Sequence, residues 1–328
     1  MIFDMNTTEP PPAIAILDDY QNVALKMANW TRVEERAAIT VFNDHLADPE
    51  AVALRLAPFD ILCVMRERTP LPRALLERLP RLKLIVTTGR RNASIDLTAA
   101  AERGIVVAHT GYSSTPTIEF AFSLILASVR NIASENASLR AGGWQRSLGG
   151  SLRGATLGVM GLGNIGAEMA RLGLAFGMTI IAWSQNLTPE RAAAAGATLV
   201  SKTELFEHSD ILSIHLVLSG RTRGLVGAQE LALMKPTARL VNSSRGPIVD
   251  ESALIEALRE GQIAGAAIDV FDCEPLPQDH PFRTLPNVLA TPHIGYVSKD
   301  MYRVFYGDTV KNILAYLDGK PPPFLLTP

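Results

Sequence analysis

The sequence predicts an α/β fold with two domains, each built on a parallel sheet. Short β-branched and apolar runs alternate with longer amphipathic segments, a pattern typical of parallel strands covered by helices. Two such series occur, and one long helical segment separates them. The 328 residues and the hydrophobic fraction of 47% are sufficient for two domains that each have a core of their own.

The first series contains five expected strands, at Ala13–Leu17, Ile39–Phe42, Ile61–Met65, Leu84–Thr87 and Ile105–Val107. Two expected helices lie between them, Glu50–Leu56 and Pro72–Leu79. Pro72 suits a first helical turn, because its missing N–H group would have no partner there. We therefore expect an α/β domain in this part of the chain.

The second series follows a long expected helix from Thr117 to Leu139. A further helix is expected from Asp250 to Glu260, with Gly261 as its C-cap. The last expected helix runs from about Ser298 to Leu317 and ends before a run of prolines. The strands expected in this series are Thr156–Met160, Met178–Trp183, Thr198–Val200, Ile211–Leu216, Arg239–Asn242, Ala264–Val270 and Val288–Ala290.

Composition argues against several classes of function. A net charge of -2 gives no indication of a nucleic-acid or membrane partner. The longest apolar stretch, Phe120 to Val129, is shorter than the ~20 residues that span a membrane, and the N-terminus lacks signal-peptide features. Cys63 and Cys273 are expected to be reduced thiols, and no residues have the local spacing of a metal site. We therefore expect a cytoplasmic protein without a metal.

A glycine-rich turn lies between an expected strand and an expected helix. The run Gly161-Leu162-Gly163-Asn164-Ile165-Gly166 follows the strand Thr156–Met160. The first glycine allows a tight turn, the second lets the backbone approach a pyrophosphate, and the third lets the helix pack closely on the strand. The N-terminus of the helix then favours the phosphate charge. We expect this turn to bind a dinucleotide, because strand, turn, helix and next strand occur in order.

The residue expected at the ribose of that dinucleotide is not a carboxylate. A site for NAD usually has Asp or Glu at the end of the second strand, about twenty residues further on. Here Ser184 and Gln185 follow the strand that ends at Trp183. No carboxylate would repel the 2′-phosphate of NADP, yet the nearest arginine, Arg191, is equally well explained as a solvated helix residue. The sequence leaves the choice between NAD and NADP open.

Three side chains suited to catalysis follow three strands of the second series. Arg245 follows Arg239–Asn242, Glu274 follows the next strand, and His293 follows Val288–Ala290. Since ligands of α/β sheets bind beyond the carboxyl ends of the strands, we expect these residues to share a site. Arginine binds a carboxylate through two hydrogen bonds, histidine exchanges protons near neutral pH, and a carboxylate orients the histidine. Such a set suits the reduction of a 2-keto acid.

Four runs of residues together resemble the D-isomer-specific 2-hydroxyacid dehydrogenase family. They are the glycine turn, Asn242 to Gly246, Asp269 to Pro275 and Thr291 to Ile294. The resemblance extends over nearly the whole chain and implies hydride transfer between a nicotinamide cofactor and the 2-position of a small D-2-hydroxy acid.

The resemblance also implies a role for each residue. Arg245 would bind and polarise the substrate, Glu274 would support the acid/base residue, and His293 would exchange the proton. Asp269 would lie close to the nicotinamide. His215 follows a strand and is expected either near the cofactor or as a packed structural histidine, whereas the sequence around His45, His208 and His280 suggests surface histidines.

The family's domain organisation is implied as well. Residues 1–110 and 298–328 would form a discontinuous, flavodoxin-like substrate-binding domain, into which an NAD(P)-binding Rossmann domain of residues 111–297 is inserted. The resemblance further implies a homodimer in which the long helix from Thr117 forms part of the contact.

One loop of the first domain departs from the family's pattern. The family holds the substrate carboxylate with backbone N–H groups of a loop that corresponds here to residues 87–96, around Gly89. Arg90 and Arg91 replace the small and apolar residues that are frequent there. They point either to solvent or to a second anionic group of the substrate. Arg66, at another strand end, is expected near the same loop, so a dianionic substrate is one hypothesis.

Two rival functions share this fold. A formate-dehydrogenase-like enzyme needs no proton exchange, so the presence of both Glu274 and His293 argues against it. A corepressor that senses NAD(H) without significant turnover would retain the same residues, although such proteins typically add long disordered tails. Turnover on a keto acid distinguishes an enzyme from this binding module.

Overall fold

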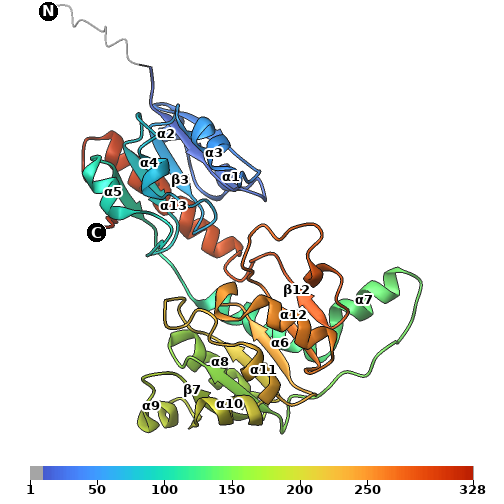
Figure 1. The fold of residues 1–328 in the computed structure, drawn as a ribbon. Helices are drawn as coiled ribbons and strands as arrows, with labels where there is room; N and C mark the ends of the chain where they lie inside the picture. Colours follow the sequence, from blue (N-terminus) through green and yellow to red (C-terminus); the bar gives the residue numbers. More distant parts are fainter. Residues whose placement is uncertain (1–9, 328) are drawn as a thin grey trace, which may run out of the picture. The chain divides into compact units, whose positions relative to one another are not determined.

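The computed structural model describes residues 10–327, which form two compact units. Unit 1 contains the residues up to Ser113 and those from Val297 onward, and unit 2 contains Ser114–Tyr296 (Figure 1). The sequence prediction placed these boundaries after residues 110 and 297. Residues 111–113 lie in unit 1, where the Gly111 N–H group donates to Asp308 Oδ2 at 2.9 Å. The expected N-terminal tail, residues 1–9, lies outside the described residues.

Unit 1 contains a five-stranded parallel sheet with the order β2-β1-β3-β4-β5. This is the flavodoxin-like order, in which the first crossover runs in one direction and the later ones in the other. The strands are β1 (Ala13–Ile16), β2 (Ala38–Val41), β3 (Ile61–Val64), β4 (Leu84–Thr87) and β5 (Val106–His109). Both β3 and β4 are buried along their whole length, as expected for central parallel strands.

Helices cover this sheet, and one comes from the far end of the sequence. Helix α13 contacts β4 and β5, and its residues Phe305, Tyr306 and Ile313 are almost fully buried. The chain therefore completes unit 1 only after it has built unit 2. The helices of unit 1 are α1 (Ala24–Met27), α2 (Thr31–Glu34), α3 (Pro49–Leu56), α4 (Arg73–Leu76), α5 (Leu97–Glu102) and α13 (Lys299–Leu317).

Unit 2 contains a seven-stranded parallel sheet with the order β12-β11-β10-β9-β6-β7-β8. The direction of the crossovers reverses between β6 and β9, as in the Rossmann fold. The strands are β6 (Thr156–Met160), β7 (Thr179–Trp183), β8 (Thr198–Leu199), β9 (Ile211–Ile214), β10 (Arg239–Asn242), β11 (Gly265–Ile268) and β12 (Val288–Ala290). Several strands end one or two residues before the predicted ends, a normal uncertainty at element boundaries.

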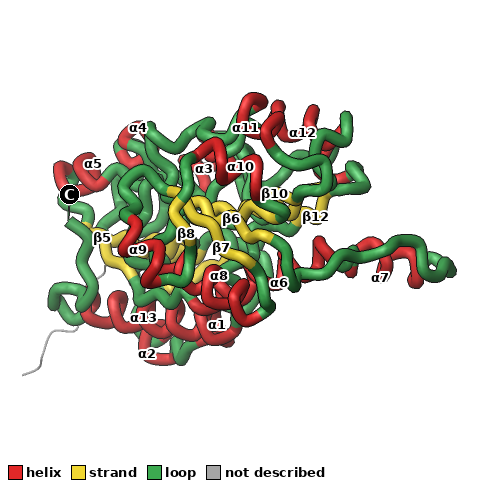
Figure 2. The backbone as a smooth tube through the Cα atoms, turned by 90° about the horizontal axis from the view of Figure 1, so that it is seen from below, coloured by secondary structure: helices red, strands yellow, loops and turns green. Residues whose placement is uncertain are grey.

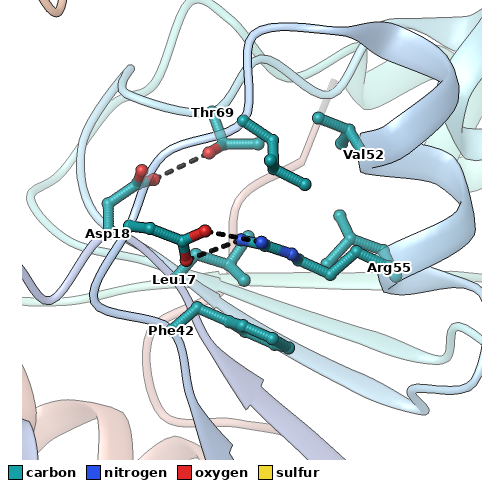
Figure 3. A pocket seen from close by; sticks show the side chains of 9 residues that line it. Leu17, Asp18, Phe42, Val52, Arg55 and Thr69 are labelled. Carbon is teal, nitrogen blue, oxygen red and sulfur yellow. Dashed lines mark hydrogen bonds and ion pairs between the residues drawn. The ribbon is translucent and has the colours of Figure 1, made fainter.

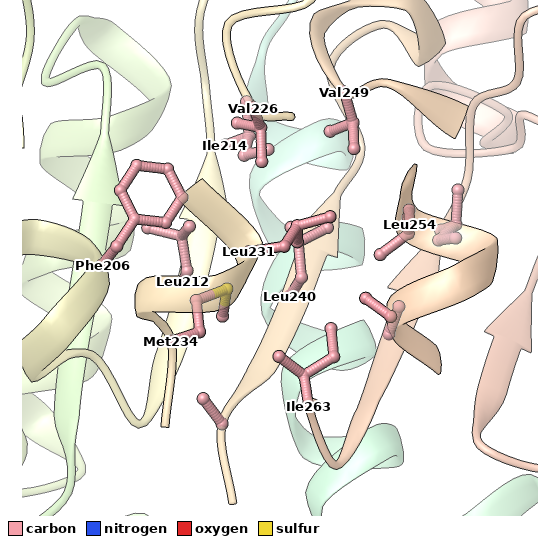
Figure 4. Close-up of a cluster of buried hydrophobic side chains, with 14 of the residues drawn as sticks. Phe206, Leu212, Ile214, Val226, Leu231, Met234, Leu240, Val249, Leu254 and Ile263 are labelled. Atoms are coloured by element: carbon pink, nitrogen blue, oxygen red, sulfur yellow. The ribbon is translucent and has the colours of Figure 1, made fainter. Parts of the chain in front are cut away.

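Apolar side chains from strands and helices form the core on one face of this sheet. Leu212, Ile214 and Leu240 of the sheet pack with Phe206, Leu231 and Leu254 of the helices (Figure 4). The helices of unit 2 are α6 (Thr115–Val129), α7 (Ile132–Arg140), α8 (Asn164–Ala175), α9 (Pro189–Ala194), α10 (Lys202–His208), α11 (Ala228–Leu233) and α12 (Glu251–Arg259), with short 3-10 turns η1 (Gly246–Ile248) and η2 (Pro281–Arg283).

The prediction of a single helix from Thr117 to Leu139 is wrong. The structure contains two helices, α6 and α7, bent by 63° at a break where Asn131 has a left-handed φ of 52°. Helix α6 packs in the core, whereas α7 extends away from the rest of unit 2 (Figure 2). Apolar periodicity continued through the break, so the sequence pattern did not show it. By length and composition, no single described helix could cross a membrane, and only this bent pair passes such a test jointly.

Candidate functional site

The expected dinucleotide turn lies at the carboxyl end of β6, beside the point where the strand order of unit 2 reverses. Gly161 has a φ of 99°, and a Cβ atom there would lie 2.7 Å from the His215 carbonyl oxygen. Gly166 packs so closely on the Gly161 carbonyl that a side chain has no room. Both positions therefore require glycine, one for conformation and contact, the other for close packing.

Gly163 differs from the other two glycines, because a Cβ atom there would meet no described protein atom within 4 Å. It is the N-cap of α8, and the first hydrogen bond of the helix runs from Ala167 N–H to the Gly163 carbonyl (2.9 Å). The N–H groups of Asn164, Ile165 and Gly166 precede that bond and face no side-chain cap. Open space beside free N–H groups at a helix N-terminus fits the pyrophosphate of a dinucleotide.

His215 follows β9 and is half-buried in this turn region. Burial lowers the pKa of His215 to about 4, so the ring is neutral at pH 7. Its Nε2 atom lies 2.8 Å from Ser213 Oγ. The side chain is thus packed and hydrogen-bonded, while its carbonyl lies against Gly161.

The carboxyl end of β7 carries no acidic side chain. Ser184 is half-buried there, its carbonyl accepts the Leu187 N–H group at 3.0 Å, and Gln185 is exposed. Arg191 is also exposed, in the first turn of α9. This end of the strand therefore offers hydroxyl and amide groups to a ribose, without a fixed negative charge.

Glu274 and His293 form a hydrogen-bonded pair in unit 2. The Nδ1 atom of His293 lies 2.6 Å from Glu274 Oε2, and the other carboxylate oxygen accepts the Phe271 N–H group at 2.9 Å. With Nδ1 occupied by a carboxylate, the Nε2 atom of His293 remains for proton exchange. The two residues come from loops after β11 and β12, which are neighbouring parallel strands, so the fold brings them together.

Asp269 holds the loop that carries His293. Its buried carboxylate accepts hydrogen bonds from Thr291 Oγ1 (2.7 Å), Ile294 N–H (2.9 Å) and Gly295 N–H (2.8 Å). Burial raises the pKa of Asp269, although these hydrogen bonds and the charge of His293 oppose that rise. His293 itself has a φ of 52°, an uncommon conformation that the surrounding hydrogen bonds support.

Arg245 follows β10 on the same edge of the sheet. One guanidinium nitrogen donates to the Ser244 carbonyl at 2.7 Å, and Asn242 Nδ2 donates to the Arg245 carbonyl at 3.1 Å. The next residue, Gly246, packs against the Phe271–Asp272 peptide so closely that a Cβ atom there would overlap it. The Arg245 loop and the Glu274 loop are therefore in direct backbone contact.

In unit 1, the predicted loop after β4 is held from two sides. The Gly89 N–H group donates to Thr110 Oγ1 at 2.8 Å, and Asn92 Nδ2 donates to the Arg66 carbonyl at 2.6 Å. The Arg66 guanidinium lies over Gly89, donates to the Thr88 carbonyl at 3.2 Å, and is 5.6 Å from the Tyr112 ring centre. Arg66 therefore shapes this loop. The sequence pattern gave no indication of Thr110, Asn92 or Tyr112, because their roles depend on contacts between distant segments.

Arg90 and Arg91 are exposed at the tip of this loop. Within the described part of the chain, neither guanidinium has an acidic partner within salt-bridge distance, so both are available to an anion. The same carboxyl edge carries a small pocket beyond β1 and β2, where Asp18 bonds Thr69 and Arg55 pairs with Asp44 (Figure 3). Those charges are already satisfied by protein partners.

Two predicted surface histidines have partners. His45 Nδ1 lies 2.9 Å from Asp18 Oδ1, and His280 Nε2 lies 2.9 Å from Glu251 Oε1. Both partners are distant in sequence, which explains why no local pattern indicated them. Among residues 10–327, no group of three or more His, Cys, Asp or Glu side chains is arranged to hold a metal ion.

Comparison with known proteins agrees with this geometry. Residues 122–295 match the model of the D-isomer specific 2-hydroxyacid dehydrogenase NAD binding domain. A glyoxylate reductase from Thermococcus litoralis is 37% identical over 305 residues, which cover 90% of this chain and 92% of that protein. A D-3-phosphoglycerate dehydrogenase from Methanocaldococcus jannaschii is 37% identical over 299 residues, 84% of this chain but 57% of that longer protein.

A solved structure is similar over almost the full chain. The phosphoglycerate oxidoreductase from Vibrio cholerae superposes with a TM-score of 0.89 at 39% identity, covering 94% of this chain and 99% of that chain. The similarity therefore includes both units.

Proposed function

The chain belongs to the D-isomer-specific 2-hydroxyacid dehydrogenase family, and from this premise we propose that it is an NAD(P)-dependent oxidoreductase acting on a small 2-keto or D-2-hydroxy acid. The observation that supports this most directly is the 2.6 Å pairing of His293 with Glu274 beside the Arg245 loop. A formate-type enzyme needs no such proton-exchanging pair. The family relatives named above are reductases and dehydrogenases, which favours an enzyme over a binding module that only senses NAD(H).

The chemistry follows from the groups that each residue offers. When bound on the Gly161–Gly166 turn, the nicotinamide cofactor supplies or accepts the hydride. His293 Nε2 donates a proton to the substrate oxygen during reduction and removes it during oxidation, while Glu274 keeps the imidazole oriented and stabilises its charged form. Arg245 binds the substrate carboxylate and polarises the carbonyl group through its planar, permanently charged guanidinium. Asp269 keeps the His293 loop in place.

We also propose that unit 1, the residues up to Ser113 and those from Val297 onward, acts as the substrate-binding domain, and that unit 2, Ser114–Tyr296, acts as the cofactor-binding domain. The loop of Gly89, Arg90 and Arg91 would bind the substrate carboxylate through the backbone N–H groups of Arg90 and Arg91, since Gly89 N–H already donates to Thr110 Oγ1, and Arg66 supports the loop. Two exposed guanidinium groups beside such a loop favour a substrate with a second anionic group. Phosphorylated and dicarboxylic keto acids have this chemistry, and glyoxylate does not.

For the cofactor, we propose that the site accepts NADPH as well as NADH. Ser184 and Gln185 stand where a carboxylate would repel the 2′-phosphate, and they carry no charge. His215 lines the turn as a neutral ring, so it adds no charge near the dinucleotide. Asp269 would lie close to the nicotinamide.

One assay tests these proposals together. The loss of nicotinamide absorbance is measured with NADH and NADPH separately, against glyoxylate, hydroxypyruvate, 2-ketoglutarate, oxaloacetate and phosphohydroxypyruvate. We expect turnover on the order of 1 per second or faster with a dianionic keto acid. The Arg90→Ala and Arg91→Ala variants should lose rate on dianionic acids only; equal losses on glyoxylate would refute the dianion proposal. Cofactor binding without turnover on any acid would instead support the sensing module.

We further propose a homodimer formed through α7 and the segment after it. Four large apolar side chains are exposed there: Ile132 (54%), Leu139 (57%), Trp144 (73%) and Leu148 (99%). An apolar arm that extends from its unit fits burial against a second copy of the chain (Figure 2). Light scattering should give twice the 35.4 kDa chain mass, and Trp144→Ser with Leu148→Ser should give monomers. Leu54→Ser, at an exposed site in unit 1, is the matched control.

A further inference from the structure

Glu251 makes hydrogen bonds to residues other than the proposed catalytic residues Arg245, Glu274 and His293. It is the first residue of α12, and its two carboxylate oxygens bind different segments. Oε1 lies 2.9 Å from His280 Nε2, and Oε2 accepts the Asp272 N–H group at 3.3 Å. Glu251 therefore connects α12 with the loop that leads to Glu274.

Helix capping does not explain these contacts. The N-cap of α12 is Asp250, whose side chain accepts the Ala253 N–H group at 3.0 Å. The charged or titratable groups that act on Asp272 are Glu251, Arg223, Asp250 and His280. Burial and the nearby Glu251 charge raise the pKa of Asp272. The hydrogen bonds of Glu251 to His280 and to the Asp272 N–H group therefore keep its carboxylate close to the Asp272 carboxyl group, although the two repel each other when both are charged.

Hydrogen bonds and ring packing hold the His280 imidazole in one orientation, so its Nε2 atom stays directed at Glu251. Its Nδ1 atom accepts the Phe282 N–H group at 3.2 Å, so Nδ1 carries no proton. The proton of the neutral ring is then on Nε2, from which it is donated to Glu251 Oε1. The ring packs 4.9 Å from Phe282, which is buried in the core with Phe271.

Glu251 and Glu274 bind consecutive N–H groups of one backbone segment. Phe271 N–H donates to Glu274 Oε1 at 2.9 Å, and Asp272 N–H donates to Glu251 Oε2. Gly246 packs on the same Phe271–Asp272 peptide, so that peptide is held by the Gly246 backbone and by the Glu251 carboxylate. The Asp272 N–H group lies in this peptide and the Phe271 N–H group lies in the preceding one, and the two peptides share the Phe271 Cα atom. A shift of this segment would therefore move the Phe271 N–H group away from Glu274, which binds His293 with its other oxygen.

We propose that Glu251, oriented by His280, is a positioning residue for the Glu274–His293 acid/base pair. It acts through the Phe271–Asp272 backbone and contacts neither substrate nor cofactor. The inference rests on the proposed function for its kinetic consequence, whereas the positioning itself is a property of the protein.

The test compares Glu251→Ala and Glu251→Gln with Glu256→Ala, an exposed glutamate on the same helix. For Glu251→Ala we expect kcat to fall about tenfold, because small displacements of catalytic groups are costly, with KM and the cofactor dissociation constant changed less than about twofold. The pH at which reduction loses half its rate should also fall, because a loosened Glu274 supports the charged imidazole less well. Glu251→Gln retains an oxygen for Asp272 N–H but turns its amide NH2 group toward the His280 Nε2–H group, so it should lose part of kcat, less than Glu251→Ala loses.

A second readout does not require turnover. Proton NMR of the imidazole region should show the low-field His293 Nδ1 proton broadened or shifted upfield in Glu251→Ala and unchanged in Glu256→Ala. If Glu251→Ala only lowers the melting temperature and leaves kcat, the pH profile and this resonance as in the wild type, Glu251 is merely structural and the proposal fails. A wild type that turns over no keto acid would refute the proposed function, while the NMR comparison would still decide the positioning role.

Discussion

His293 shows how far its chemistry depends on its immediate neighbours. The residue adopts a φ of 52°, and its ring meets Glu274 while the following N–H groups bind Asp269. A non-glycine residue in the left-handed region costs free energy, so the surrounding hydrogen bonds have to hold it. The imidazole orientation is therefore a product of two segments, the one after β11, which carries Asp269 and Glu274, and the one after β12, which carries His293.

Replacement of His293 by alanine removes the proposed proton donor, while the backbone hydrogen bonds of the next two residues to Asp269 remain. We expect kcat to fall by about 10²–10⁴-fold, because general acid/base groups contribute that much, while the dissociation constant for the reduced cofactor stays within about twofold. Stopped-flow rates and cofactor fluorescence measure the two quantities. His208→Ala, at an exposed histidine, serves as the control; unchanged turnover in His293→Ala would exclude His293 from catalysis.

The lowered pKa of His215 predicts that the free energy of unfolding decreases at acidic pH. Its pKa falls from 6.5 to about 4 on folding because the ring is buried. Between those pH values the unfolded chain binds a proton at this residue and the folded protein does not, so the free energy of unfolding decreases as the pH is lowered through that window. The decrease reaches roughly 3 kcal/mol.

Urea unfolding between pH 7 and pH 4 measures that slope. In His215→Gln the slope over this window should be smaller, because the titrating group is absent. His208→Gln, whose side chain is exposed in the folded protein, should keep the wild-type slope. Equal slopes in wild type and His215→Gln would mean that His215 titrates alike in both states.

At the scale of single elements, the turn between β6 and α8 separates structural glycines from a binding glycine. Gly161 and Gly166 meet protein backbone, whereas the position of a Cβ atom on Gly163 is open. The sequence motif treats the three alike, and only the structure tells them apart. The break between α6 and α7 lies at Asn131, whose side chain has partners distant in sequence: its Nδ2 donates to Ser147 Oγ at 3.1 Å, and its Oδ1 accepts from Arg239 at 3.4 Å.

Gly163→Ala should therefore weaken cofactor binding without weakening the fold. Gly163 has extended backbone angles that alanine adopts freely, so the free energy of unfolding should change by less than about 1 kcal/mol. The added methyl group would occupy the approach of the pyrophosphate, and we expect the dissociation constant to rise at least about tenfold. Gly307→Ala, at an open position in α13, is the control for both measurements; tight binding by Gly163→Ala would place the pyrophosphate elsewhere.

At the scale of the whole molecule, the two units differ in how the chain builds them. Unit 2 is one continuous segment, Ser114–Tyr296, with its hydrophobic clusters formed inside it. Unit 1 needs both ends of the chain, because α13 contacts β4 and β5 and the side chain of Asn312 binds the His109 carbonyl at 2.8 Å.

A fragment of residues 114–296 should therefore fold alone and bind the cofactor. We expect cooperative thermal unfolding by circular dichroism and a cofactor dissociation constant within about tenfold of the full chain, without turnover, since the proposed substrate loop is absent. The reciprocal fragment that ends at Tyr296 should lose the structure of unit 1 while retaining that of unit 2. A fragment 114–296 that does not fold would show that unit 2 depends on unit 1.

Much of this molecule was readable in the sequence because the relevant signals are local. Alternating strands and helices, the glycine turn, and the Arg245, Glu274 and His293 positions after strands all arise within short windows, and parallel sheets gather the strand ends at one edge. Only the tertiary structure shows the break at Asn131 and the partners of His45 and His280. The same holds for the hydrogen bond between Glu251 and the backbone of the Glu274 loop, and for the different roles of the three glycines. Each of these depends on contacts between residues distant in sequence, where packing and hydrogen bonding outweigh local preference.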